Sequence, residues 1–498
     1  MLCFLKITSP EQIQSQSRLR TKSQNEFIIF AENQNYMTLI KSISGIRGTI
    51  GGAVEDNLTP IDAVKFAAAY GTWLKQQRDK ENYRVVVGRD ARISGEMIQN
   101  LVMNTLVGLG IHVIDLGLST TPTVEIAVPM EHADGGIILT ASHNPKQWNA
   151  LKLLNNKGEF LNGAEGQKIL EIAESNAMIF AEVDDLGKIT KNEAYIDIHI
   201  DEVLELPLVN KKAIEAANFK VVVDGVNSTG GIAIPLLLER LGVHPVKLYC
   251  DPTGHFPHNP EPLKEHLGDL AEAVVKERAD FGIVVDPDVD RLAFMDETGE
   301  MFGEEYTLVA CADYVLSKNP GNTVSNMSST RALRDVTEKY GGTYEASSVG
   351  EVNVVAMMKK NNVVIGGEGN GGIIYPESHY GRDALVGVAL FLSLLAERKM
   401  KVSELRASYP NYYMSKKKIQ LTPGLDVDGI LSTMESNYSH EKLTTIDGVK
   451  IDFADSWAHL RKSNTEPIIR IYTEAPSQEA ADTLADRIIG EIKAVANI

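Results

Sequence analysis

The sequence predicts an α/β protein whose domains are built from βαβ units around mixed, mostly parallel sheets. Strand-like and helix-like patterns alternate along most of the chain, as expected for such units. The alternation occurs three times, and the pattern changes over residues 411–498. Because 498 residues are too many for a single hydrophobic core, we expect three similar α/β/α domains and one further domain.

The first predicted unit opens with a buried strand at residues 84–88. An amphipathic helix at 97–109 and a strand at 111–114 follow, and the apolar run 135–139 then leads directly into Ser142. Short apolar runs bounded by turn residues are typical of buried strands. The first unit therefore delivers a serine to the end of a strand.

The other two units end in the same manner. Their opening and closing strands lie at 221–225 and 281–285 in the second unit, and at 323–325 and 363–366 in the third. The closing strands lead into Asp286 in the second unit and into Gly367 and Glu368 in the third. The Asn-Ser-Thr run at 227–229 is predicted to cap a helix. Three polar loops are thus expected to converge on one cleft.

The C-terminal segment has a different pattern. Asp447 and Gly448 predict a hairpin turn, strand-like pieces lie on either side of Arg461, and an amphipathic helix is expected at 478–494. This pattern indicates a small α+β domain with an antiparallel sheet.

The first 36 residues are rich in Gln, Ser and Asn, and Met37 opens a segment that resembles the start of a domain. We expect residues 1–36 to be a disordered extension or to lie upstream of the natural start. The predicted domains span 37–190, 191–297, 298–410 and 411–498.

Composition excludes several classes of function. The net charge of −18, from 49 basic and 67 acidic residues, argues against nucleic acid or a membrane surface as a partner. An anionic small substrate is compatible with this charge if basic residues converge locally. No run of 18 apolar residues occurs, and Cys3, Cys250 and Cys311 form no metal-binding spacing. We expect a reduced, cytoplasmic protein.

The loop around Ser142 reads Leu-Thr-Ala-Ser-His-Asn-Pro-Lys-Gln-Trp-Asn over residues 139–149. A serine at the carboxyl end of a buried strand lies where α/β proteins place their chemistry. The loop adds an imidazole, an amide and a nearby lysine, all suited to phosphate. An ordinary strand-to-loop turn is the alternative, since Ser, Asn and Pro are common in turns.

The second loop places Asp286, Asp288 and Asp290 at alternate positions. Clustered carboxylates repel one another, and all-oxygen ligation favours Mg²⁺ or Mn²⁺ over zinc. A calcium-binding EF-hand requires Gly at the sixth loop position, which is Arg291 here, and helices where the flanks resemble strands. A solvated acidic turn and an aspartate nucleophile are the remaining alternatives.

The third loop, residues 367–372, contains G-x-G-x-x-G but is followed by a strand-like run, so a dinucleotide site is disfavoured. Glu368 and Asn370 are natural partners for sugar hydroxyls. A glycine-rich turn with an exposed glutamate is the alternative.

Near the C-terminus, a group of basic, hydroxyl and amide side chains suits a phosphate, although a polar hairpin loop is the alternative. Its members are Arg461, Ser463, Asn464, Thr465 and Arg470. Arg47, between two glycines, and Lys152, ten residues beyond Ser142, add weaker signals.

Five motifs, in this order over residues 40–498, resemble the α-D-phosphohexomutase family, whose members move phosphate between C6 and C1 of hexoses. They are Gly-Ile-Arg-Gly, Thr-Ala-Ser-His-Asn-Pro, Asp-x-Asp-x-Asp-Arg, the loop beginning Gly-Glu, and Arg-x-Ser-Asn-Thr. The resemblance implies four domains around a central cleft, the fourth similar to TATA-binding protein.

The resemblance also implies roles for these residues. Ser142 is expected to carry the phosphoryl group and, with the three aspartates, to bind one Mg²⁺. The residues expected to assist transfer are Arg47, His143, Lys152 and Arg291. Those expected to bind substrate are Glu368, Asn370, Arg461, Ser463, Asn464, Thr465 and Arg470. A hexose 1,6-bisphosphate is the expected intermediate and activator.

Two departures from the family pattern lie in the region that recognises the sugar. Many relatives have serine where Asn370 stands and histidine where Gly372 stands, and some have a basic residue in the loop at 348–351. The Glu-Gly-Asn-Gly-Gly form most resembles members that interconvert glucosamine 6-phosphate and glucosamine 1-phosphate. Mannose or glucose phosphates are the alternative substrates. A non-catalytic sugar-phosphate sensor and a phosphatase are more distant alternatives, and a monomer or homodimer is expected.

Overall fold

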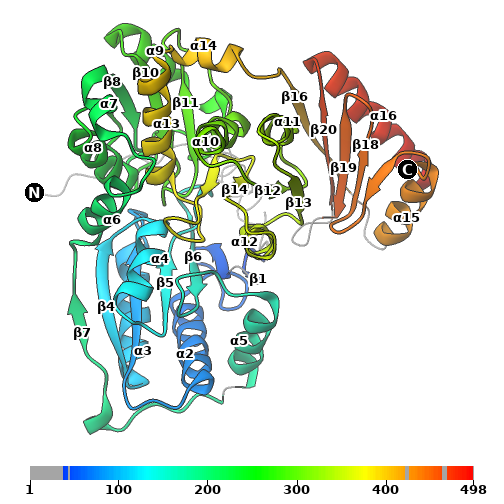
Figure 1. Cartoon of the computed structure of the whole chain (residues 1–498). Helices are drawn as coiled ribbons and strands as arrows, with labels where there is room; N and C mark the ends of the chain where they lie inside the picture. Colours follow the sequence, from blue (N-terminus) through cyan, green and yellow to red (C-terminus); the bar gives the residue numbers. More distant parts are fainter. Residues whose placement is uncertain (1–36, 43–44, 176, 421–424, 463–467, 497–498) are drawn as a thin grey trace, which may run out of the picture.

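A computed structural model describes residues 37–42, 45–175, 177–420, 425–462 and 468–496, which form four sheets in four domains (Figure 1). The predicted extension at 1–36 and three of the predicted phosphate ligands, Ser463, Asn464 and Thr465, lie outside the described residues. The predicted boundaries between domains remain predictions, because the sheets locate the bodies of the domains rather than their ends.

Domain I is built on a seven-stranded sheet of order β1-β2-β6-β5-β3-β4-β7. The strands are β1 (Ile40–Ser42), β2 (Gly45–Thr49), β3 (Tyr83–Arg89), β4 (Ile111–Leu118), β5 (Gly135–Leu139), β6 (Trp148–Leu154) and β7 (Ile189–Lys191). The helical segments are α2 (Pro60–Gln77), α3 (Gly95–Gly108), α4 (Thr121–Met130), α5 (Gly163–Ser175) and the short 3-10 turn η1 (Val183–Asp185).

Domain II has a four-stranded sheet of order β11-β10-β8-β9. Its strands are β8 (Lys220–Asp224), β9 (His244–Leu248), β10 (Phe281–Val285) and β11 (Leu292–Met295). Its helical segments are α6 (Tyr195–Leu204), α7 (Lys211–Ala217), α8 (Gly230–Arg240), η2 (Lys264–His266) and α9 (Gly268–Glu277).

Domain III has a four-stranded sheet of order β13-β12-β14-β15. Its strands are β12 (Thr323–Asn326), β13 (Tyr344–Ser347), β14 (Ile365–Glu368) and β15 (Gly372–Ile374). Its helices are α10 (Glu304–Lys318), α11 (Ala332–Lys339), α12 (Glu351–Lys360), α13 (Ala384–Arg398) and α14 (Val402–Ala407).

Domain IV is an antiparallel sheet of order β16-β20-β19-β18-β17 with two helices, which confirms the predicted C-terminal α+β class. Its strands are β16 (Tyr413–Gln420), β17 (Lys442–Thr444), β18 (Val449–Asp452), β19 (Trp457–Lys462) and β20 (Ile468–Ala475). Its helices are α15 (Val427–Asn437) and α16 (Gln478–Ala496).

The predicted threefold repetition is present in the sheets. In each of the first three domains, an opening strand lies between its two parallel partners, and a fourth strand adds antiparallel at one side. The repeated orders are β4-β3-β5-β6, β9-β8-β10-β11 and β13-β12-β14-β15. In every repeat, the loop between the third and fourth strands carries the polar motif found in the sequence. The three loops that carry polar motifs therefore occupy the same topological position in their domains.

The predicted helix cap at 227–229 is confirmed in its position but not in its hydrogen bond. Helix α8 begins at Gly230, and Thr229 at its N-cap position makes no capping bond with its side chain. Instead the hydroxyls of Ser228 and Thr229 donate to the carbonyl oxygen of Pro287, at 2.7 and 2.9 Å. These bonds anchor the loop between β10 and β11, so a tertiary contact has replaced a local one.

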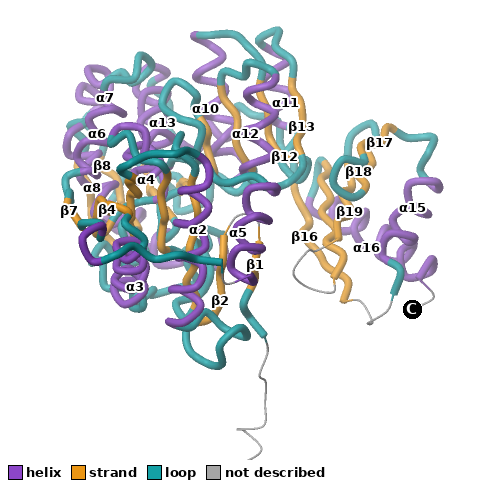
Figure 2. Tube along the Cα trace, turned by 90° about the horizontal axis from the view of Figure 1, so that it is seen from below, coloured by secondary structure: helices purple, strands orange, loops and turns teal. Residues whose placement is uncertain are grey.

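The hydrophobic cores show which domains form one body. A single buried cluster runs through domains II and III and includes most of α10 and α13, whereas domain IV has a core of its own. Figure 2 shows β16–β20, α15 and α16 set to one side of the rest of the chain. Apolar packing thus joins domains II and III more closely than it joins domain IV to either of them.

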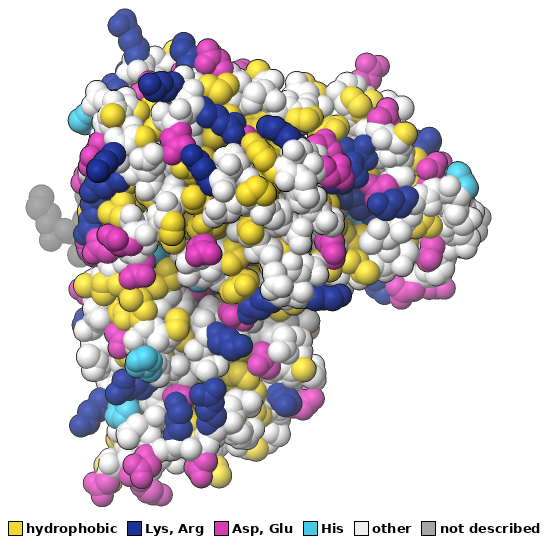
Figure 3. Space-filling view, viewed as in Figure 1, with side chains coloured by type: hydrophobic (Ala, Val, Ile, Leu, Met, Phe, Trp, Pro, Cys, Tyr) yellow, Lys and Arg dark blue, Asp and Glu magenta, His cyan; other side chains and the backbone are white. Residues whose placement is uncertain are grey.

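Within the described residues, no helix is both long and apolar enough to cross a membrane. On the face drawn in Figure 3, basic and acidic side chains are interspersed. The net charge of −18 is therefore not gathered on that face.

Candidate active site

The loop between β5 and β6 holds Ser142 in an unusual backbone conformation. Its φ is +49°, in the left-handed region that non-glycine residues seldom adopt, and the residue is 7% exposed. The Ser142 amide donates to the Thr140 hydroxyl at 2.9 Å, and that hydroxyl donates to Asp90 at 2.7 Å. Hydrogen bonds from within the loop therefore support the strained residue.

Arg92, which the sequence analysis did not single out, lies buried beneath this loop. Its guanidinium pairs with Asp90 at 3.0 Å and donates to a set of loop carbonyls. The acceptors are the carbonyl oxygens of Ser142, Asn144, Pro145 and Trp148. The available signal was a charged cluster directly after strand β3, the same kind of position that revealed the other loops.

The loop between β10 and β11 gathers three fully buried carboxylates, those of Asp286, Asp288 and Asp290. One oxygen from each lies within 4.8 Å of the others. Val289, between two of them, has a φ of +65°, which is rare for a β-branched residue. Thr121, at the start of α4, donates its hydroxyl to Asp288 at 2.5 Å, so domain I contacts this loop directly.

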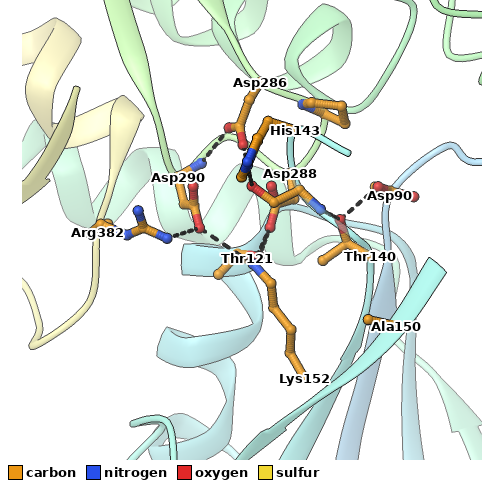
Figure 4. Close-up of polar contacts among 12 residues, drawn as sticks. Asp90, Thr121, Thr140, His143, Ala150, Lys152, Asp286, Asp288, Asp290 and Arg382 are labelled. Carbon is orange, nitrogen blue, oxygen red and sulfur yellow. Dashed lines mark hydrogen bonds and ion pairs between the residues drawn. The ribbon is translucent and has the colours of Figure 1, made fainter. Parts of the chain in front are cut away.

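Lys152 on β6 supplies the nearest positive charge. Its ammonium lies 2.7 Å from Asp288 and 3.4 Å from Asp290 (Figure 4). Burial alone would raise the pKa of Asp288, but Lys152 and Thr121 hold it below its usual range. Burial and the two neighbouring carboxylates raise the pKa of Asp286 well above its usual range. The raised pKa of Asp286 reflects, besides burial, repulsion among the three carboxylates, which a cation bound among them would relieve.

Ser142 and the aspartates are in direct contact. The Ser142 hydroxyl donates to Asp286 at 2.6 Å and lies 3.3 Å from Nδ1 of His143. Burial, reinforced by the charge of Arg291, lowers the pKa of His143 well below its usual value. His143 is therefore a neutral imidazole beside the serine oxygen.

The donor set fits a hard divalent cation. Among the described residues, Oδ1 of Asp288 and Oδ1 of Asp290 are buried and have no hydrogen-bond partner. Leaving charged oxygens buried and unpartnered is costly unless a cation binds them. Three carboxylates with a nearby hydroxyl, and no sulfur or imidazole among the grouped ligands, suit Mg²⁺ or Mn²⁺.

The loop between β14 and β15 carries Glu368, which is buried at the end of β14. Its Oε1 accepts from Nδ2 of Asn326 at 2.8 Å and from the amide of Gly350 at 3.1 Å. Burial opposes the charge, but Arg382 and Asn326 hold the pKa of Glu368 below its usual value. Asn370 lies 3.4 Å from the other carboxylate oxygen.

Arg382 joins the aspartate loop to the Glu368 loop. Its guanidinium donates to Asp290 at 2.7 Å (Figure 4). It also donates to Glu368 at 3.0 Å and to Glu351 at 3.1 Å. Burial would lower its pKa, but these carboxylates raise it well above the usual value. No spacing in the sequence indicates this residue, because its partners lie in three separate segments of the chain.

Close packing explains the glycines of the Glu368 loop. Gly371 has a φ of +86°, and a Cβ there would lie 2.2 Å from the carbonyl oxygen of Leu292 on β11. The amide of Leu292 donates to the carbonyl of Gly371 at 3.0 Å. The glycine is required by contact with the aspartate-bearing domain.

Arg47 on β2 and Arg291 add positive charge to the same region. Burial, followed by the charge of Arg291, lowers the pKa of Arg47. Nη1 of Arg291 pairs with Glu261 at 3.2 Å, while its Nε is buried without a hydrogen-bond partner among the described residues. Two neighbouring guanidinium groups are suited to an anion.

Arg461 and Arg470 lie apart from this cluster, opposite each other on β19 and β20 of domain IV. Nε of Arg461 lies 3.0 Å from Asp447, and the pair is about one-fifth exposed, at 23% and 22%. The structure thus brings together the serine, aspartate and glutamate loops, and it places the described arginines of the predicted cradle on the separate fourth domain.

Four domain descriptions of one family match the chain in order. Phosphoglucomutase/phosphomannomutase α/β/α domain I matches residues 39–179, domain II matches 197–299, and domain III matches 303–413. The C-terminal domain of the same family matches 397–491.

Individual relatives agree over nearly their full length. A phosphoglucomutase/phosphomannomutase of Thermococcus kodakarensis is 37% identical over 440 residues, covering 87% of this chain and 95% of the relative. A phosphoglucosamine/phosphogalactosamine mutase of Sulfurisphaera tokodaii is 32% identical over 451 residues, covering 89% and 97%.

A solved structure of a phosphoglucomutase/phosphomannomutase family protein from Burkholderia thailandensis superposes with a TM-score of 0.80 at 25% identity. It covers 92% of this chain and 98% of that protein. With four matching domains in order and relatives matched over nearly their full length, the chain belongs to the phosphoglucomutase/phosphomannomutase family and is a phosphohexomutase, an isomerase that transfers a phosphoryl group within its substrate.

Proposed function

We propose that this phosphohexomutase interconverts glucosamine 6-phosphate and glucosamine 1-phosphate, and that Ser142 carries the transferred phosphoryl group. The observation that carries the proposal is the 2.6 Å contact between the Ser142 hydroxyl and Asp286, within the cluster of buried aspartates. It sets the serine oxygen beside a group of carboxylates suited to a divalent cation.

Asp286, Asp288, Asp290 and the oxygen on Ser142 would hold one Mg²⁺. When bound, this ion supplies positive charge that stabilises the negative charge of a phosphoryl group in transfer. The unpartnered oxygens of Asp288 and Asp290 support this assignment.

In the first half-reaction, a free sugar hydroxyl attacks the phosphorus of phosphorylated Ser142. The bond between Oγ and phosphorus breaks, a sugar oxygen–phosphorus bond forms, the sugar hydroxyl loses its proton, and Oγ gains one. Neutral His143, 3.3 Å from Oγ, is placed to move a proton at that atom. The product is a hexose 1,6-bisphosphate.

In the second half-reaction, the bisphosphate turns around and returns its other phosphate to Ser142. Arg47, Arg291 and Lys152 would stabilise the transferring group, while Glu368 and Asn370 bind the hydroxyls of the sugar. The phosphate that does not react would be bound by domain IV. The residues proposed for this are Arg461, Ser463, Asn464, Thr465 and Arg470.

Charge on the sugar side of the cleft supports an amino sugar. Glu368 keeps its charge, since its pKa lies below the usual value, and its partner Arg382 is shared with Asp290 and Glu351. With Asp290 assigned to the metal ion and the pKa of Glu351 raised by burial, Glu368 is the charged carboxylate that suits the ammonium group of glucosamine.

A coupled assay comparing glucosamine 6-phosphate, mannose 1-phosphate and glucose 1-phosphate, each with a trace of the matching 1,6-bisphosphate, tests the proposal. We expect the highest kcat/KM with glucosamine 6-phosphate and no turnover after chelation of divalent ions. A higher kcat/KM with mannose or glucose 1-phosphate would refute the substrate assignment. Steady release of inorganic phosphate without isomerised product would indicate a phosphatase.

The second candidate is a phosphoglucomutase/phosphomannomutase. It is favoured by the 37% identity to the Thermococcus kodakarensis relative of that name. The same assay separates the two candidates.

A further inference from the structure

Asp447 lies in the predicted hairpin turn, and its carboxylate also contacts two other segments of the chain. The turn joins β17 to β18, and Gly448, with a φ of +75°, supplies its left-handed residue. The Asp447 carboxylate reaches out of this hairpin in two directions. It lies 3.0 Å from Nε of Arg461 on β19, and it accepts the amide of Val349 in domain III at 2.9 Å.

The contact with Arg461 fixes the plane of a phosphate-binding side chain. A guanidinium presents its five N–H donors in a rigid planar fork. When a carboxylate engages the Nε edge, the direction of the Nη donors is set as well. Because Arg461 is 23% exposed, it would otherwise lose rotamer freedom when phosphate binds, and preorganisation reduces that cost.

The contact with Val349 ties this arrangement to the sugar side of the cleft. Val349 is followed by Gly350, whose amide donates to Glu368 at 3.1 Å. A further bond joins the same two loops, from the Ser348 hydroxyl to the carbonyl of Ile446 at 3.2 Å. One short loop of domain III therefore contacts both Asp447 and Glu368.

A second series of hydrogen bonds connects the Asp447 turn to the carboxylate of Glu368. The backbone carbonyl of Asp447 accepts from Nε2 of His459 at 2.7 Å, and Nδ1 of His459 accepts from Ser328 at 2.9 Å. Ser328 lies in the loop after β12, two residues beyond Asn326, which ends that strand and is the second donor to Oε1 of Glu368. These two donors to Oε1 of Glu368 thus lie close in the chain to residues that contact the Asp447 turn.

We propose that Asp447 is a positioning residue: it orients Arg461 toward the distal phosphate and holds that orientation in register with the loop that supports Glu368. Its carboxylate spans the boundary between the domain that binds this phosphate and the domain that binds the sugar. This inference rests on the proposed function for the roles of Arg461 and Glu368.

Asp447→Asn tests the proposal with little change in shape, since the amide still offers an oxygen to Val349 but carries no charge for Arg461. We expect glucose 1,6-bisphosphate, titrated calorimetrically, to bind about tenfold more weakly, with a similar rise in KM and a kcat within about twofold of wild type. Asp455→Asn makes the same charge change at an exposed position of domain IV and is expected to leave both constants unchanged.

A double-mutant cycle with Arg461→Ala separates positioning from general stability. If Asp447 acts through Arg461, then Asp447→Asn has no further effect on bisphosphate affinity in the Arg461→Ala protein. Additive losses would overturn the proposal, as would a lower kcat at unchanged KM, the result expected from a smaller folded fraction.

Ser348→Ala provides the second variant, because it removes a bond between the same two loops without touching Arg461. We expect a KM close to wild type, and a rise equal to that of Asp447→Asn would reduce the role of Asp447 to domain docking. If wild type neither binds the bisphosphate nor isomerises any hexose phosphate tested, the proposed function fails. If wild type binds the bisphosphate and Asp447→Asn binds it equally well, only the positioning role proposed for Asp447 fails.

Discussion

The serine and aspartate loops and the arginine pair of domain IV are built in opposite ways. Asp286, Asp288 and Asp290 are fully buried and bonded across domains I, II and III, whereas Arg461 is 23% exposed and belongs to a domain with its own core. A preorganised centre lowers the cost of stabilising charge during transfer. A separately packed domain can open and close around a substrate. This contrast suggests that the serine and aspartate loops hold their side chains in place, whereas domain IV can move to bind the distal phosphate.

The two regions predict different kinetic defects. A change in the fixed centre should lower kcat or destabilise the protein, because its groups support one another through buried bonds. A change in domain IV should mainly raise KM, because its arginines bind a part of the substrate that does not react.

The largest effect is expected for Ser142→Ala. Loss of the phosphoryl acceptor should reduce mutase turnover by more than about 10³-fold, measured in the coupled assay with bisphosphate present. Binding of glucose 1,6-bisphosphate serves as the control and should survive, since the arginines remain. Turnover near the wild-type rate would contradict the role proposed for Ser142.

Arg92→Met probes the buried support of the serine loop. Removing the guanidinium leaves Asp90 buried without its ion pair and takes the donors from the loop carbonyls. We expect the free energy of unfolding of domain I to fall by about 3–5 kcal/mol, measured by urea denaturation. Arg84→Met, at an exposed position on strand β3, which precedes Arg92, is the matched control. Equal losses in the two variants would show that the buried contacts of Arg92 contribute nothing particular to stability.

The strand pattern made the three functional loops predictable. Buried strands in parallel sheets are short apolar runs, so the residues that follow them lie at one edge of each sheet. Ser142, Asp286 and Glu368 were all found in this way, and the structure joins their loops through the contact between Ser142 and Asp286 and through Arg382.

Residues defined by distant contacts were not predictable. Arg382 contacts Asp290, 92 positions away in the chain, and neither residue carries a local pattern that names the other. Asp447 resembled an ordinary turn residue for the same reason. The Ser-Thr pair at 228–229 correctly indicated the start of α8 but not the partner of its hydroxyls, which donate to a carbonyl of another loop.

We expect acid to destabilise domain IV by protonating His459. Burial lowers the pKa of His459 to about 4, so the folded protein disfavours the protonated ring. The contribution of His459 to the free energy of unfolding is therefore complete above the unfolded pKa of about 6.5, and it is lost as the pH falls from there toward 4. The depression corresponds to about 3 kcal/mol.

Urea denaturation of domain IV at pH 7.5 and pH 5, compared between wild type and His459→Gln, measures this contribution. Glutamine can keep both an acceptor for Ser328 and a donor for the Asp447 carbonyl, but it does not titrate. We expect the variant to show a smaller loss of stability at pH 5. An identical loss in both proteins would assign the acid sensitivity to other groups.

Arg461→Ala tests phosphate binding by domain IV and should have the smallest effect of the four variants. The variant loses a charge-assisted contact with the distal phosphate, which should raise KM about tenfold, while kcat stays within a few-fold of wild type because the transferring group is stabilised elsewhere. An unchanged KM would remove Arg461 from the phosphate-binding group. A fall in kcat as large as that of Ser142→Ala would abolish the contrast, since the arginine would then belong to the chemical centre. The expected result instead lets one domain bind either phosphate of the bisphosphate in turn, because a guanidinium recognises phosphate without regard to the carbon that bears it.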